Sequence, residues 1–238
     1  MKDEDKAKDQ LIKELQKMRE KVTGLEEVKL KYNQVDKKLK QTDIKLQKFI
    51  EGIADIITKV IELRDPYSIG HLQRVSKLAM AIAQEMKLPQ DKIRGIKIAS
   101  LVHDIGKVNL PSEIVRKPGK LIEVEFNLIK SHPKISYDLL KRIDFPWPIA
   151  EIVFQHQEKI DGSGYPRGLK GDEICIEAKI LGVANVVEAM SSYRSYRPAL
   201  IIDEALNEID KNKNIIFDPE VVDACIKLFK EKGFKFEL

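Results

Sequence analysis

The sequence predicts an all-α protein in which a long N-terminal coiled-coil helix precedes a helical domain. The first 63 residues contain two glycines and no proline, and their apolar residues recur in steps of three and four. The rest of the chain holds shorter segments whose apolar residues keep to one helical face. Loops rich in proline and glycine separate these segments. No two segments show the alternating pattern of a β-hairpin.

An apolar stripe runs along residues 1–63, which we expect to form a coiled-coil signalling helix. Its two series are Leu11, Leu15, Met18, Val22, Leu25 and Val28, Tyr32, Val35, Leu39, Thr42, Leu46, Phe49, Ile53, Ile56, Val60, Leu63. The register slips near Gly24, where the series meet. A parallel homodimer would bury this stripe, and a single amphipathic helix packed back on the domain is the alternative. Because apolar density rises after Phe49, the last three turns are expected to join the globular core or its dimer contact.

Residues 64–238 are expected to form the second domain. Its helices are expected at residues 69–86, from 89 to near 103, and at 123–131, 133–143, 148–157, 174–190, 199–210 and 219–231. Prolines and glycines concentrate in residues 110–120 and 161–171, so these two segments are expected to be loops.

Composition argues against several functions. The net charge of +4 comes from residues 1–50, which hold 14 basic and 10 acidic residues, whereas the remaining 28 basic and 28 acidic residues balance. A solvated helix face accounts for that excess, so DNA is not an expected partner. No apolar run reaches the roughly 20 residues of a membrane span, and no signal-peptide core follows Met1. Cys175 and Cys225 form no disulfide framework and indicate a reduced, cytoplasmic protein.

The histidines point to a metal site. The chain has only four, His71, His103, His132 and His156, and all lie in its central stretch. His103 and Asp104 are adjacent, so they offer a nitrogen and a carboxylate to the same point, which suits a transition-metal ion. For this pair alone, a buried histidine in an apolar helix end is the alternative. The clustering of all four histidines favours the metal site.

Several segments, in order, resemble the motifs of HD-GYP domains. They are Arg64 to His71, His103-Asp104, Lys117-Pro118-Gly119-Lys120-Leu121, Ser131-His132-Pro133, Asp161-Gly162-Ser163-Gly164-Tyr165-Pro166 and Arg194-Ser195-Tyr196-Arg197. The resemblance covers residues 64–222. It implies an HD-type helical bundle with extra C-terminal GYP helices. It also implies a phosphodiesterase that hydrolyses cyclic di-GMP, a bacterial second messenger, with a centre of iron or manganese.

The resemblance also implies the metal ligands. His71, His103 and Asp104 would hold one metal, and Asp104 would bridge to a second metal held by His132 and His156. Such a shared carboxylate keeps two cations close enough to assist in-line attack by a water on a phosphodiester.

The same resemblance implies the substrate contacts. Lys107 would act in catalysis with His103 and Asp104, by offsetting charge on the scissile phosphate. Arg194 and Arg197 would grip phosphate or the guanine edge, unless they are a solvated surface pair. The last group, which would shape the cleft or serve only as a structural turn, consists of Gly164, Tyr165 and Pro166.

Two positions depart from the family pattern. Gln157 stands where the family has a second consecutive histidine, and Asn185 stands where it has an aspartate ligand. Both amides can still coordinate, but as neutral, weaker donors. One or two metals per chain are expected, with fewer than two firmly held after purification.

These departures leave the function open. The sequence favours a cyclic di-GMP phosphodiesterase, impaired by the two changes. The alternative is a catalytically degenerate domain that binds the nucleotide as a receptor or signalling module, and a phosphohydrolase of another nucleotide is a third reading. The resemblance implies an upstream sensor or receiver protein as a partner, and the alternative is that the coil itself is the receiving element. A register shift in the coil would arrive close to His71.

Overall fold

The structure is a computed structural model that describes residues 2–64, 69–117, 119–192 and 201–236. Every regular element within these ranges is helical, apart from two isolated bridges that pair Asp161 with Lys170 and Lys213 with Phe217. The predicted all-α class is confirmed. Among the described helices, none combines the length and the apolar character needed to cross a membrane.

The first helix, α1, runs from Lys2 to Arg64. The chain divides into two compact units, residues 1–52 and 53–238, so the last turns of α1 fall in the second unit. Ala54, Thr58 and Ile61 are buried there, as the apolar density after Phe49 suggests. The division therefore lies before the predicted boundary at residue 63.

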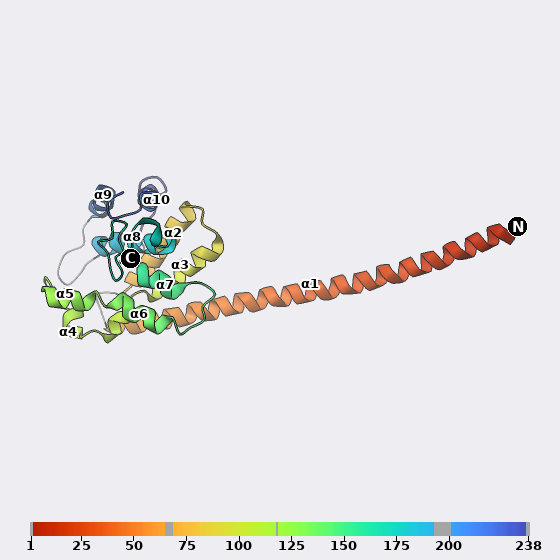
Figure 1. Ribbon diagram of the computed structural model, residues 1–238, viewed down its shortest axis with the longest axis horizontal. Coiled ribbons are helices and arrows are strands. Elements are labelled where there is room, and N and C mark those ends of the chain that lie inside the picture. Colours follow the sequence, from red (N-terminus) through yellow and green to blue (C-terminus); the bar gives the residue numbers. More distant parts are fainter. Residues whose placement is uncertain (1, 65–68, 118, 193–200, 237–238) are drawn as a thin grey trace. The chain divides into compact units, whose positions relative to one another are not determined.

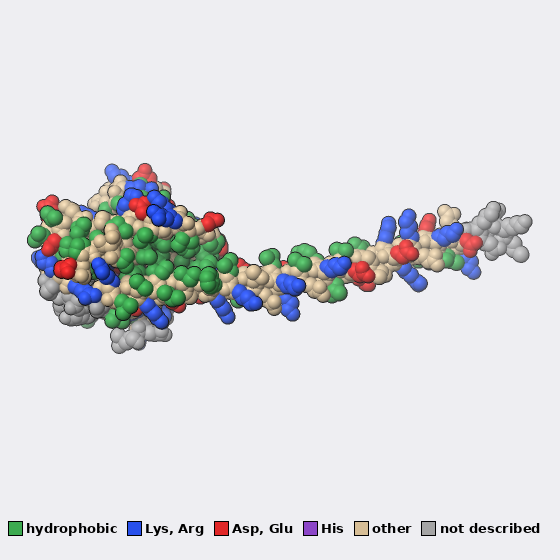
Figure 2. All heavy atoms as spheres, turned by 90° about the horizontal axis from the view of Figure 1, so that it is seen from below, with side chains coloured by type: hydrophobic (Ala, Val, Ile, Leu, Met, Phe, Trp, Pro, Cys, Tyr) green, Lys and Arg blue, Asp and Glu red, His purple; other side chains and the backbone are tan. Residues whose placement is uncertain are grey.

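Within the first unit, the apolar stripe of α1 is open to solvent. Val28, Leu39 and Phe49 are 63%, 66% and 65% exposed. Figure 2 shows apolar side chains at intervals along this helix, between basic and acidic ones. The exposure of these side chains means that the stripe lacks a packing partner within residues 8–52. A helix that buries no apolar face gains little stability from packing.

The second unit contains the remaining elements. They are α2 (His71–Glu85), α3 (Gln90–Val102), η2 (Ile105–Asn109), α4 (Ser112–Val115), α5 (Glu123–Ile129), α6 (His132–Leu140), α7 (Ile149–Gln155), η3 (Gly171–Glu173), α8 (Ile176–Ser191), α9 (Ile202–Lys211) and α10 (Pro219–Lys230). The predicted helices occur, with ends shifted by a few residues. The loop predicted for residues 110–120 is wrong in part, because α4 forms there. Pro111 fixes the backbone at its start, and Glu113 suits its first turn.

The core forms around α2 and α8. Buried residues on α2 recur at the helical period, as Leu72, Val75, Leu78 and Ile82 show. This face packs against α3, α8 and α10. In Figure 1, α9 and α10 lie together at one edge of the second unit, and α4, α5 and α6 lie at the opposite edge.

Candidate metal centre

Three histidines lie at helix ends and are oriented by their own backbone. His103 follows α3, His132 begins α6 and His156 follows α7. In each ring Nδ1 lies 2.6–2.8 Å from the carbonyl oxygen three residues earlier. Because a carbonyl oxygen only accepts, Nδ1 carries the proton and Nε2 keeps its lone pair. Each ring is therefore prepared to act as a ligand through Nε2.

Two buried groups bring the predicted ligands together. His71, His103 and Asp104 each offer one atom, and these atoms lie within 4.8 Å of one another. The same holds for Asp104, His132 and His156. Asp104 belongs to both groups, with Oδ1 3.4 Å from His132 Nε2 and Oδ2 3.6 Å from His103 Nε2. The five residues thus form two candidate metal positions that share Asp104.

The donor atoms fit a metal cation. His103 Nε2 is buried and has no hydrogen-bond partner among the described residues, which is rare for a buried polar atom. The Nε2 atoms of His132 and His156 face each other at 3.4 Å. Burial lowers the pKa of His103 and of His132 to about 4 and that of His156 well below its usual range. At neutral pH these lone pairs therefore lack protons, and a metal ion can satisfy them.

Lys107 lies against the shared carboxylate. Its Nζ atom is 2.7 Å from Asp104 Oδ2, and its side chain is 24% exposed. Burial alone would raise the pKa of the Asp104 carboxyl, but Lys107, His103 and His132 together hold it well below its usual range. Asp104 is therefore ionised, as a metal ligand must be. Lys107 comes from η2, the turn that directly follows Asp104.

Gly106 lets this turn approach α6 closely. A side chain at Gly106 would collide with the carbonyl oxygen of His132 and with Ser136. The Gly106 N–H donates to Ser136 Oγ at 2.8 Å, and that hydroxyl donates to the carbonyl oxygen of His103 at 3.0 Å. The segment that carries His103 and Asp104 is thereby joined to the helix that carries His132.

Glu188 is a residue of the site that sequence reasoning missed. Its carboxylate is fully buried on α8 and pairs with Nδ1 of His71, the atom that meets a backbone carbonyl in the other three histidines. The signal was present in the sequence: Glu188 falls on the buried face of α8, one turn after Ala184. An acidic residue at such a position requires a partner.

The loop of residues 161–170 is held by Glu158. Its buried carboxylate accepts hydrogen bonds from the backbone N–H groups of Arg167 and Leu169, at 2.7 and 3.0 Å. Gly164 packs directly on the backbone of Glu158 and leaves no room for a side chain. These contacts give the glycine-rich loop one defined shape.

Tyr165 lies beside the group that contains His132. Its ring meets the ring of His132 edge-on, with 6.5 Å between centroids, and the peptide bond to Pro166 is cis. Burial, assisted by Asp104, raises the pKa of Tyr165 to about 12. Its hydroxyl is therefore a hydrogen-bond donor at neutral pH.

The remaining predicted residues are placed only in part. Gln157 and Asn185 are both half-buried, the first directly after His156 and the second one turn before Glu188 on α8. Arg194 and Arg197 lie outside the described residues. The roles assigned to these four residues stay predictions, as do the ligand and substrate roles of the other predicted site residues.

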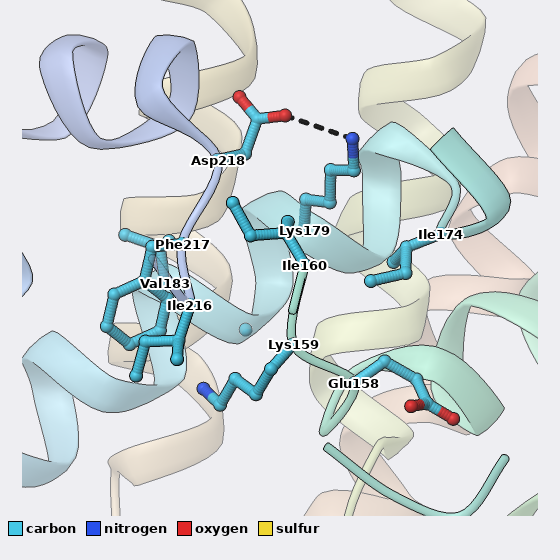
Figure 3. Close-up of a pocket in the computed structure, with 10 residues that line it drawn as sticks. Glu158, Lys159, Ile160, Ile174, Lys179, Val183, Ile216, Phe217 and Asp218 are labelled. Carbon is cyan, nitrogen blue, oxygen red and sulfur yellow. Dashed lines mark hydrogen bonds and ion pairs between the residues drawn. The ribbon is translucent and has the colours of Figure 1, made fainter. Parts of the chain in front are cut away.

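A small pocket lies beside the loop (Figure 3). The ammonium of Lys159 lies 4.2 Å from the centre of the Phe217 ring, and Lys179 pairs with Asp218 at 3.0 Å. In Figure 3 the Glu158 carboxylate points away from these lysines, which agrees with its contacts to the loop. No residue of the two histidine groups lines this pocket.

Comparisons with known proteins agree with this geometry. Residues 55–221 match the HD domain family. The chain is 39% identical over 173 residues to the cyclic di-GMP phosphodiesterase response regulator RpfG of Xanthomonas campestris, covering 72% of this chain and 46% of that protein. It is 37% identical over 209 residues to a cyclic di-GMP phosphodiesterase of Thermotoga maritima, covering 87% of this chain and 57% of that protein.

A solved structure is also similar. A cyclic GMP-AMP specific phosphodiesterase of Vibrio cholerae superposes with a TM-score of 0.52 at 27% identity, over 79% of this chain and 43% of that chain. The chain spans about half the length of the curated relatives that it matches. The family match covers well over half of the chain, and the ordered motifs resemble those of HD-GYP domains. The chain therefore belongs to the HD domain family and, within it, to the HD-GYP group.

Proposed function

We propose that this chain is a metal-dependent phosphodiesterase that hydrolyses cyclic di-GMP. The observation that carries the proposal is the pair of buried ligand groups that share Asp104. Two relatives named for this activity, at 39% and 37% identity, support the choice of substrate. A cytoplasmic location follows from the proposal, since the substrate is a bacterial second messenger.

Each residue of the centre has a role in this proposal. When bound, two divalent cations supply Lewis acidity to an attacking water and to the phosphate. Asp104, which belongs to both groups, would hold both cations. His103, His132 and His156 would hold them as neutral ligands that leave the positive charge of the ions available. Lys107 offsets the charge that develops on the phosphate oxygens. Tyr165 donates a hydrogen bond to the substrate, and Arg194 and Arg197 hold its phosphate or guanine groups.

We propose iron or manganese as the metal, with one or two ions per chain. Imidazole and carboxylate ligands suit both metals. If Gln157 and Asn185 serve as ligands, they are neutral, and the metals are then held less firmly than by a histidine and an aspartate. We expect fewer than two metals per chain after purification, and metal analysis of the purified protein checks this.

The test of the function is hydrolysis of cyclic di-GMP by protein loaded anaerobically with iron or manganese, with metal counted on the same sample. We expect turnover that rises with metal occupancy and disappears in His103→Ala. Absence of turnover at full occupancy would refute the proposal.

A second candidate is a receptor that binds the nucleotide without cleaving it. The observation that favours it is the pair of substitutions at Gln157 and Asn185. The double variant Gln157→His with Asn185→Asp separates the two functions. A rise in turnover by orders of magnitude would show that ligand loss limits the enzyme, whereas tight nucleotide binding without turnover in both proteins would favour the receptor. Cyclic GMP-AMP belongs in the same assay, because the similar solved enzyme is named for that substrate.

We also propose that α1 forms a homodimer through its exposed stripe and that an upstream sensor or receiver protein acts on it. The support is the exposure of the heptad positions between Leu11 and Phe49.

A further inference from the structure

We infer that Glu188 is a positioning residue of the metal centre. Glu188 fixes His71, so the position formed by His71, His103 and Asp104 binds its metal ion more tightly than the position formed by Asp104, His132 and His156. This inference rests on the metal centre of the proposed function. Glu188 does not belong to either ligand group.

The Glu188 carboxylate pairs with His71 and with two neighbouring side chains. One carboxylate oxygen, Oε2, pairs with His71 Nδ1. The other, Oε1, accepts hydrogen bonds from Arg74 Nε at 2.8 Å and from Ser192 Oγ at 2.7 Å. Because a buried carboxylate is costly unless it is paired and hydrogen-bonded, these contacts hold the side chain of Glu188 in one place. His71 is held with it.

The partner of Nδ1 distinguishes His71 from the other three histidines. In His103, His132 and His156 that partner is a neutral backbone carbonyl. A carboxylate partner orients the ring and makes the opposite nitrogen a stronger donor. His71 is therefore the strongest imidazole ligand of the centre, and it serves only the group that contains His103.

Glu188 also changes the charge of the centre. Asp104 is the only carboxylate in the two ligand groups. Glu188 brings a second buried carboxylate to the His71 position, and its side chain is 0% exposed, whereas its partner Arg74 is 23% exposed. Arg74 offsets this charge in part, since its guanidinium lies 2.7 Å from Glu188 Oε1. The other oxygen, Oε2, pairs with His71 and adds negative charge next to this metal position, which favours a divalent ion there.

The test is a titration of the full chain with Mn²⁺, in which electron paramagnetic resonance measures the concentration of the free ion. We expect two classes of site in the wild type. In Glu188→Gln the dissociation constant of the tighter class should rise 10–100-fold, which is the usual effect of losing such a partner. Glu177→Gln is the matched control, because Glu177 is another buried glutamate on α8, paired with Lys92 away from the histidines.

Several outcomes would overturn the inference. Unchanged affinity of the tighter class in Glu188→Gln would do so, as would an equal loss in Glu177→Gln. If Glu188→Gln does not fold, Glu188→Asp replaces it. The shorter carboxylate keeps the charge but withdraws from His71. A Mn²⁺ affinity of the tighter class equal to that of the wild type in Glu188→Asp would refute the positioning role. Wild-type chain that binds no Mn²⁺ would refute the metal centre as well. If the wild type hydrolyses cyclic di-GMP but Glu188→Gln leaves the Mn²⁺ affinity unchanged, the positioning role is refuted and the proposed function stands.

Discussion

At the residue scale, the site depends on histidines that stay neutral although Asp104 lies beside them. Burial outweighs the attraction of the carboxylate and lowers the pKa of His103 and His132 to about 4. Backbone carbonyls accept hydrogen bonds from the Nδ1–H groups of His103, His132 and His156, so these three rings are oriented before any metal binds. Because these side chains are already ordered, metal binding does not have to order them.

These lowered pKa values predict how the metal-free chain responds to acid. The unfolded chain takes up protons on its histidines below about pH 6.5, whereas folded His103 and His132 resist protonation until about pH 4. Stability is therefore lost as the pH falls through that window. We expect the Tm in the presence of a chelator to drop by roughly 5–10 °C between pH 7 and pH 5, measured by differential scanning calorimetry.

His132→Asn is the control for this prediction. The variant lacks one of the buried histidines, so its Tm should depend less steeply on pH. The lowered pKa of Asp104 acts below about pH 4 and does not contribute in this range. An identical slope in the variant, or a Tm that rises on acidification, would contradict the prediction.

The sequence predicted which residues gather in the two buried groups but not what supports them. Four histidines confined to one stretch of the chain, with His103 beside Asp104, suggested a metal centre, and the resemblance assigned them to two positions. Glu188 escaped because it is more than 100 residues from His71, and only the packing of α2 against α8 brings the two together. Local patterns do not show such long-range pairs.

At the element scale, the carboxylate of Glu158 supports the backbone of the loop of residues 161–170 at two points. A glutamine at position 158 keeps one carbonyl oxygen but turns an NH₂ group toward the N–H of Arg167 or of Leu169. One of these hydrogen bonds is then lost, and the loop that presents Tyr165 loosens. We expect Glu158→Gln to raise KM for cyclic di-GMP roughly tenfold, which corresponds to about 1.4 kcal/mol, and to leave the metal content unchanged.

Steady-state kinetics and metal analysis check this prediction together. Glu151→Gln is the matched control, because Glu151 contacts the side chain of Arg167 rather than the loop backbone and is 36% exposed. Its effect should be small. Loss of metal in Glu158→Gln would show that Glu158 acts on the centre itself and not through the loop.

The end of α1 is a second element whose role the sequence showed only in part. Thr58 Oγ1 donates to the carbonyl oxygen of Leu101 at 2.9 Å, two residues before His103. The Gly70 N–H donates to Glu62 at 2.7 Å, one residue before His71. The sequence placed the last turns of α1 in the core by their apolar density. It could not show that their polar groups bond to the segments that carry the histidines.

These contacts predict that Thr58→Val destabilises the domain. Valine has nearly the same shape but leaves the buried carbonyl of Leu101 without its donor, which costs about 1–2 kcal/mol. Urea denaturation measures this loss. Thr23→Val, on an exposed turn of the same helix, should change stability by less than about 0.5 kcal/mol. Equal effects of the two changes would mean that the contact with Leu101 contributes nothing.

At the scale of the whole molecule, the apolar stripe of α1 is the feature that a single chain leaves unfinished. Leucine, valine and phenylalanine side chains recur along it at heptad spacing and are more than half exposed. A second copy offers the same stripe in the same register, and packing the two buries both. The predicted homodimer would thus place two metal centres in one particle.

This dimer predicts a clear response to one charged residue. Leu39 lies on the stripe and is 66% exposed, so a glutamate there would be buried against its copy, and two buried like charges repel. We expect Leu39→Glu to sediment as a monomer at concentrations where the wild type is a dimer. Gln41→Glu introduces the same charge off the stripe and should leave the dimer intact. Dissociation in both variants would point to general charge repulsion, and a persistent dimer in Leu39→Glu would place the interface elsewhere.

The same samples also show whether dimerisation affects turnover, because the end of α1 bonds to the backbone beside His71 and His103. A monomer with full turnover would mean that the coil joins the two chains but does not regulate the centre.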